Sequence, residues 1–111
     1  MKTILLSVTT NRGFRAAGVT FNVVIVRKGE QYGHRDCLTH EGDDPLVEFY
    51  DADYAGKEGF TDAGQFVSRY YVSTLLDPHR CRFGLNLCGH EPKWQIDTKD
   101  MDPVLDALKK L

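Results

Sequence analysis

Residues 20–28 read TFNVVIVRK, a run whose apolar side chains would point to both sides of an extended chain. Phe21, Val23 and Ile25 would share one face, because successive side chains of a strand alternate. Val24 and Val26 would occupy the other face. A strand that is apolar on both faces is covered on both sides, so this stretch predicts a central strand of a sheet.

Further strands are expected on both sides of this stretch in the sequence. Residues 2–10 are rich in β-branched side chains and predict a first strand, followed by a loop at 11–18 that contains two glycines. After a tight turn, residues 31–38 are expected to return as the hairpin partner of the central strand. Residues 41–45 combine Glu, Gly, Asp and Pro, which favours a loop, and residues 46–50 then predict another strand.

The strongest helix pattern covers residues 62–76. Thr61 or Asp62 could cap its first turn by accepting bonds from free backbone amides, and Pro78 would stop it. The apolar stripe of this expected helix consists of Ala63, Phe66, Val67, Tyr70, Tyr71, Thr74 and Leu75. Such an aromatic stripe is typical of a helix packed on a core.

The C-terminal third predicts a second hairpin and a last helix. Residues 80–88 alternate apolar and polar side chains, and a turn leads to residues 93–98, which complete the hairpin. Asp102 is the expected cap of the last helix, with Pro103 at its first helical position. We therefore expect one α+β domain over residues 1–111, with a mostly antiparallel sheet of five or six strands and two helices packed on one face.

Composition narrows the classes of function. The chain has 111 residues with 41% hydrophobic and 27% charged residues, and its net charge of −2 does not fit a globally basic nucleic-acid binder. No segment approaches the ~20 apolar residues of a membrane span. The apolar run in residues 1–8 is too short for a secretory signal peptide, so we expect a cytoplasmic protein that makes no membrane contact. The three cysteines are an odd number, and free cysteine usually behaves as a small buried hydrophobe.

Catalytic and cofactor patterns are missing from the sequence, and we expect neither an enzyme nor a bound cofactor. A small zinc-binding domain is one alternative, because zinc prefers four thiolate and imidazole ligands. The best candidate ligands are His34, Cys37, His40 and Cys88. Their spacing is not a recognised zinc pattern, so we assign no metal ligand.

Charge is distributed in blocks along the chain. Residues 1–39 hold six basic and two acidic residues, whereas residues 40–62 hold one basic and eight acidic residues. The acidic block suggests a docking surface for a partner with a basic surface, steered by complementary fields. The residues we assign to this surface are Asp43, Asp44, Glu48, Asp51 and Asp53.

The basic N-terminal block suggests a second alternative, a strip that binds single-stranded nucleic acid through cations and stacking rings. The residues of this strip would be Arg12, Phe14, Arg15, Phe21, Arg27, Lys28, Tyr32 and Arg35.

Three segments carry a resemblance to known proteins: RDCL at 35–38, PLVEFYD at 45–51 and GQFVSRYY at 64–71. In these segments the chain resembles small uncharacterised bacterial proteins associated with phages and integrating elements. The resemblance implies a compact accessory protein that acts by binding, as anti-CRISPR and other host-takeover proteins do, and it transfers no functional residue. The leading hypothesis is thus a non-enzymatic binding protein, an inhibitor from a mobile element that docks on a host protein complex.

Overall fold

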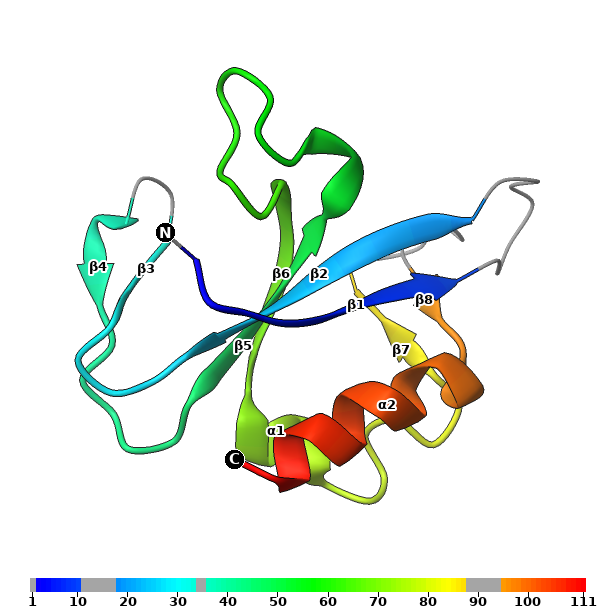
Figure 1. Cartoon of the computed structure of the whole chain (residues 1–111). Coiled ribbons are helices and arrows are strands. Elements are labelled where there is room, and N and C mark those ends of the chain that lie inside the picture. Colours follow the sequence, from blue (N-terminus) through cyan, green and yellow to red (C-terminus); the bar gives the residue numbers. More distant parts are fainter. Residues whose placement is uncertain (1, 11–17, 34–35, 88–94) are drawn as a thin grey trace.

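A computed structural model describes residues 2–10, 18–33, 36–87 and 95–111. Its centre is a four-stranded antiparallel sheet in the order β1-β2-β5-β6 (Figure 1). The strands are β1 (Ile4–Thr10), β2 (Val19–Val26), β5 (Leu46–Asp51) and β6 (Gln65–Tyr71). The α+β class and the mainly antiparallel sheet are confirmed, but this sheet has four strands rather than five or six.

The central strand predicted from TFNVVIVRK is confirmed. β2 lies between β1 and β5, and its residues from Phe21 to Val26 are all buried. The hairpin expected between β2 and residues 31–38 is wrong, because β5 occupies that side of β2. Within this segment Gly33 and Asp36 adopt positive φ angles of 87° and 53°, which break an extended run.

Four short strands form two separate ladders. β3 (Gln31–Tyr32) pairs with β4 (Leu38–Thr39), and we call residues 31–33 and 36–39 the arm. β7 (Leu85–Asn86) pairs with β8 (Gln95–Ile96), so the second hairpin is confirmed in shortened form. Gly84 is needed there, because a Cβ atom at this position would lie 2.5 Å from the carbonyl oxygen of Ile96.

The helix predicted over residues 62–76 is wrong. Residues 65–71 form β6, and only the five residues of α1 (Val72–Leu76) are helical. The ladder between β5 and β6 shifts register between Phe49 and Tyr50, which inserts Val67 as an extra residue in β6. This β-bulge gives the apolar residues a three-residue spacing, and Val67 and Tyr70 both pack against the main core. The bulge thus imitates the periodicity of a helix.

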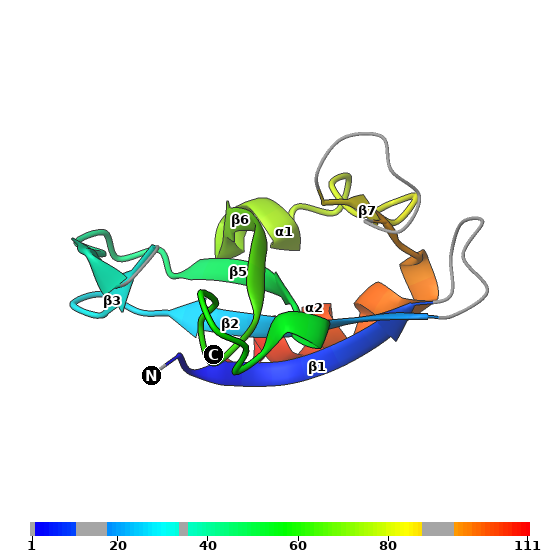
Figure 2. The same cartoon turned by 90° about the horizontal axis from the view of Figure 1, so that it is seen from above.

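The last helix, α2 (Thr98–Lys109), begins earlier than predicted and lies beside β1 (Figure 2). Its N-cap residue is Asp97 rather than Asp102, and Pro103 lies inside the helix. The helical turn that precedes Pro103 carries Met101, which is fully buried. Burial of this side chain stabilises a helix that begins before the proline. None of the helices in the described part of the chain is long and apolar enough to cross a membrane.

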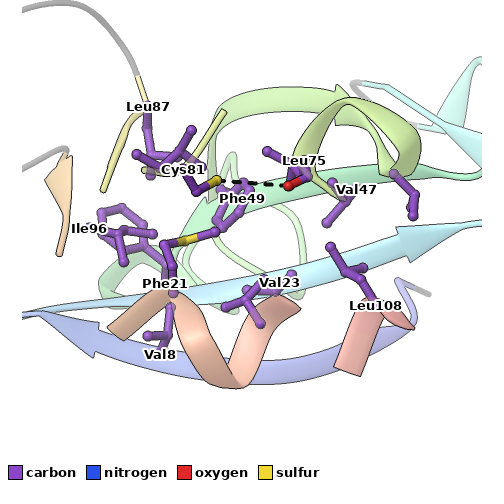
Figure 3. Packing of buried hydrophobic residues seen from close by; sticks show 14 of the residues in the cluster. Val8, Phe21, Val23, Val47, Phe49, Leu75, Cys81, Leu87, Ile96 and Leu108 are labelled. Atoms are coloured by element: carbon purple, nitrogen blue, oxygen red, sulfur yellow. Dashed lines mark hydrogen bonds between the residues drawn. The ribbon is translucent and has the colours of Figure 1, made fainter. Parts of the chain in front are cut away.

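The main core joins one face of the sheet to side chains of both helices and of the β7–β8 ladder. Phe21, Val23, Val47 and Phe49 come from the sheet, and Figure 3 shows them among residues of the other elements. Cys81 lies in this core, where its thiol points to the carbonyl oxygen of Leu75 at 4.0 Å. Burial raises the pKa of the Cys81 thiol, in keeping with its packing as a small hydrophobe.

Candidate functional site

A fully buried carboxylate lies under the opposite face of the sheet. All six residues of β5 are buried, and alternation sends Val47 and Phe49 to the main core. Leu46 and Tyr50 point to the other side, which we call the second face, together with Glu48. Glu48 is thus enclosed by apolar neighbours, where a charge is stable only if it is paired and hydrogen-bonded.

Glu48 finds its partners on the sheet itself. The Tyr50 hydroxyl donates a hydrogen bond of 2.9 Å to Oε1 of Glu48. Arg69 stands directly opposite Glu48 in the register of β5 and β6, and its Nε and Nη2 atoms each lie 2.9 Å from Oε2. Burial raises the pKa of Tyr50, and the charge of Glu48 raises it further, so this hydroxyl remains a donor.

The Arg69 guanidinium is fixed by aromatic rings as well as by Glu48. Its central carbon lies 4.9 Å from the ring centroid of Tyr32 and 4.8 Å from that of Phe66. Such contacts attract a cation to the ring face. Glu48 and the two rings fix the position of the guanidinium, and the side chain, at 32% exposed, still meets solvent.

A pocket of about 410 Å³ opens beside this guanidinium. Its lining is mainly apolar and includes Gly33 of the arm, Tyr50, Phe60, Thr61, Phe66 and Arg69. Two of the segments that contribute to this lining, the arm and the loop that follows β5, project separately from the sheet (Figure 1). We call residues 52–64 the 52–64 loop, which begins with the 3-10 turn η2 (Ala52–Tyr54).

The 52–64 loop returns to the sheet through a tight turn. The Thr61 hydroxyl oxygen accepts hydrogen bonds from the amides of Ala63 and Gly64, each at 3.2 Å. Gly64 has a φ of 123°, and a Cβ atom there would lie 2.1 Å from the carbonyl oxygen of Asp51. Glycine at this position therefore lets the loop close against the end of β5.

Lys2 connects the two walls of the pocket. Its ammonium group is buried, donates to Oδ1 of Asp36 at 2.7 Å and to the carbonyl oxygen of Gly33 at 3.2 Å, and lies 5.7 Å from the ring centroid of Tyr50. The backbone amide of Lys2 donates to the carboxylate of Asp62 in the 52–64 loop, with a shortest distance of 3.2 Å. The hydrogen bond from Lys2 holds the pKa of Asp36 below its ordinary value.

The five acidic residues assigned to a docking surface do not form one surface. Glu48 and Asp51 are buried, and Asp51 accepts a hydrogen bond from the amide of Asp53 at the start of η2. Asp43 and Asp44 precede β5 and Asp53 follows it, so the six residues of β5 separate them by roughly 20 Å. Acidic residues from one short stretch of the sequence thus lie at opposite ends of a strand.

Asp43 and Asp44 also have unlike roles. Asp43 is exposed and forms an ion pair of 3.0 Å with Lys28. Asp44 holds the start of α1, because its carboxylate accepts bonds from the amide and the hydroxyl of Ser73. Asp44 is therefore engaged in the fold, and Asp43 is open to a partner.

The residues of the two alternative functions are only partly described. Of the candidate zinc ligands, Cys37 is exposed and His40 is buried, with Nε2 2.7 Å from the carbonyl oxygen of Asp44. His34 and Cys88 lie outside the described residues, and among those that are described no three His, Cys, Asp or Glu side chains form a metal cluster.

The two described rings of the basic strip are engaged within the fold. Phe21 is fully buried in the main core, and Tyr32 is stacked on Arg69, whereas Arg27 and Lys28 are exposed. The remaining members lie outside the described residues: Arg12, Phe14, Arg15 and Arg35.

Sequence reasoning missed Arg69, Phe66 and Phe60. One signal was present, because PLVEFYD places the charged Glu48 inside an apolar strand and so calls for a cationic partner nearby in space. A helix over residues 62–76 does not identify this partner, because Arg69 is placed opposite Glu48 only by the pairing of β5 with β6. No family model, curated protein or solved structure matches this chain.

Proposed function

We propose that this chain is a non-enzymatic binding protein and that a partner protein docks on the second face of its sheet, at the Arg69 pocket. The observation that carries the proposal is the buried Glu48, which holds Arg69 between two rings at the pocket mouth. Apolar replacements of a buried ion pair are often neutral or stabilising, so stability alone does not account for the pair. A rigidly held guanidinium is instead suited to recognition.

Two exposed aromatic residues, Phe60 and Phe66, line the pocket, and a third, Tyr71, lies farther along β6. Phe60, Phe66 and Tyr71 are 39%, 45% and 52% exposed. Phe66, Arg69 and Tyr71 face the same side of β6, since they oppose Tyr50, Glu48 and Leu46 in the register. We call Phe60, Phe66, Arg69 and Tyr71 the aromatic surface. Phenylalanine, tyrosine and arginine are enriched at the centres of protein interfaces, which supports docking here.

The nature of the partner rests on the sequence resemblance. A mobile-element inhibitor would act in the cytoplasm of its host and occupy a surface on a host protein complex. The contact we propose is the aromatic surface rather than the acidic residues, because only Asp43 and Asp53 of the five are exposed and they lie at opposite ends of β5. An aromatic surface with a central arginine buries apolar area and supplies a directional contact.

The test is a pull-down from bacterial lysate with the full chain and three variants, in which bound proteins are identified. We expect a defined partner to be retained by the wild type and lost with Phe66→Ala. Phe83→Ala is the matched control, because Phe83 is 84% exposed but does not line the pocket. Asp43→Lys tests the acidic alternative. Equal retention by Phe66→Ala and the wild type, or loss with Asp43→Lys alone, would contradict docking at the aromatic surface.

A further inference from the structure

We infer that the Arg69 pocket receives the C-terminal residue of the partner polypeptide, with an apolar side chain in the pocket and the terminal carboxylate on Arg69. This inference rests on the proposed function and specifies its contact. It follows from the open edge of the guanidinium, the apolar lining, the size of the pocket and the local charge balance.

The guanidinium of Arg69 has one edge in use and one edge open. Nε and Nη2 face Glu48, whereas Nη1 has no hydrogen-bond partner in the described part of the chain. A guanidinium carries five N–H donors in a fixed fork, and two parallel donors match the two oxygens of a carboxylate. The edge formed by Nη1 and the second proton of Nη2 is therefore available for a carboxylate from outside.

The pocket beside this edge suits an apolar side chain. Phe60 and Phe66 contribute rings to its lining, and Gly33, Gly59 and Gly64 contribute no side chain. The Thr61 hydroxyl is occupied within its own turn, since it donates to the carbonyl oxygen of Gly64 at 3.0 Å. An apolar group entering here leaves few polar atoms of the protein without partners.

The size of the pocket favours one residue that carries both groups. A pocket of about 410 Å³ is at the small end of ligand pockets, which span roughly 300–1,000 Å³. In an extended peptide, neighbouring side chains point to opposite sides, so an internal acid and an adjacent apolar residue would not enter together. The C-terminal residue is the one residue of a chain that bears an apolar side chain and a carboxylate on the same Cα atom.

The charges around the pocket favour a carboxylate over a phosphate as its ligand. Glu48 is ion-paired with Arg69, and Asp36 is ion-paired with Lys2. The pocket therefore offers a directional pair of donors rather than a strong positive field. A singly charged carboxylate with an apolar body gains from both features, whereas a compact dianion such as phosphate would be repelled by the buried carboxylate nearby.

The test uses the full ¹⁵N-labelled chain and two matched fragments at neutral pH, N-acetyl-L-phenylalanine and its neutral C-terminal amide. We expect saturable shifts of the backbone amides of Gly33, Gly59 and Gly64 with the carboxylate fragment. The amide fragment should bind at least about tenfold more weakly, because it loses charge-assisted hydrogen bonds. Equal affinities, shifts confined to another part of the chain, or displacement of the fragment by inorganic phosphate would overturn the inference.

Two variants locate the contact. Arg69→Lys keeps the charge but loses the paired donors, so the affinity for the carboxylate fragment should fall toward that for the amide. A melting curve checks that this variant folds, and Phe60→Ala provides a second variant that leaves Glu48 and Arg69 in place. Phe60→Ala should weaken both fragments equally; unchanged binding there contradicts the assigned pocket.

The two proposals can fail separately. If a partner is captured through Phe66 but the carboxylate fragment has no preference over the amide, docking stands and the C-terminal contact is wrong. If neither the lysate partner nor the fragment depends on the pocket, the proposed function falls as well.

Discussion

Glu48 and Arg69 join the fold to the proposed site at the level of single residues. The carboxylate is fully buried between apolar neighbours on β5, and its partner Arg69 reaches solvent at the pocket. We expect Glu48→Ala to lower the free energy of unfolding by about 3 kcal/mol, because it leaves Arg69 and the Tyr50 hydroxyl without their acceptor. Urea denaturation of the variant and the wild type measures this loss.

An apolar triple variant separates stability from function at the same position. Replacing Glu48 by Leu, Tyr50 by Phe and Arg69 by Met removes every member of the polar group at once, which is often nearly neutral. We expect the free energy of unfolding of the triple variant to lie within about 1.5 kcal/mol of the wild type. Partner capture should be lost, because Arg69 is absent. A triple variant as unstable as Glu48→Ala would show that the ion pair is required for folding.

Asp43 and Asp44 are adjacent but should respond differently to alanine. Asp44 caps the first turn of α1 through Ser73, and loss of such a cap costs about 1 kcal/mol. Asp43 has an exposed ion pair with Lys28, so Asp43→Ala should change stability by less than about 0.5 kcal/mol. Thermal unfolding of the two variants side by side checks the difference, and equal effects would refute the capping role.

At the level of elements, the closure of the 52–64 loop on β5 depends on Gly64. A Cβ atom there would lie 2.1 Å from a backbone oxygen and would occupy a φ of 123°. We expect Gly64→Ala to cost more than about 2 kcal/mol and to open the pocket wall. Gly56→Ala is the control, since its φ of 75° carries strain but a Cβ atom would meet nothing within 4 Å. Chemical denaturation that ranks Gly56→Ala as the costlier change would contradict the assigned contact.

The ion pair between Lys2, which precedes β1, and Asp36 of the arm should contribute to stability in a pH-dependent way. The hydrogen bond from Lys2 lowers the pKa of Asp36 below its ordinary value of 3.8. The folded state thus binds this proton less readily than the unfolded chain, so the bond stabilises the protein above the ordinary value and is lost as pH falls through the lowered one. We expect Asp36→Asn to reduce the loss of stability below about pH 4, measured by thermal melts across the acid range. If the melting temperature of Asp36→Asn falls with pH as it does in the wild type, Asp36 makes no contribution to the acid dependence.

The sequence predicts elements whose signal is local and misses those set by pairing. The central position of β2 follows from its apolar residues on two faces, β1 from its β-branched residues, β5 from the largely apolar stretch after a loop, and the β7–β8 hairpin from alternation. The sequence predicts a helix in place of β6, because the bulge at Val67 changes the spacing of the apolar residues. Pairing with β5 determines that this segment is a strand. Such pairing brings together residues that are far apart in the sequence, so it has no local sequence signal. Arg69 could be placed opposite Glu48 only after that pairing was known.

At the level of the whole molecule, the exposed carboxylates Asp43 and Asp53 lie at opposite ends of β5 rather than in one shared field. Partner binding at the aromatic surface should therefore depend weakly on ionic strength. We expect the dissociation constant to rise by less than about fivefold between about 50 and 300 mM salt, because exposed charges are screened over that range and apolar contacts are not. Titration calorimetry with the captured partner measures this dependence. A much steeper rise would favour docking through exposed carboxylates.

The bulge at Val67 has a further consequence for the behaviour of the protein in concentrated solution. β6 is the last strand in its sheet order, and an end strand with a regular ladder is a template for another chain. An extra residue twists the strand and interrupts the even row of amides and carbonyls that a second copy would need. The same irregularity that sets Phe66 and Arg69 on one face of β6 thereby protects the protein against aggregation at the strand that carries its proposed binding site.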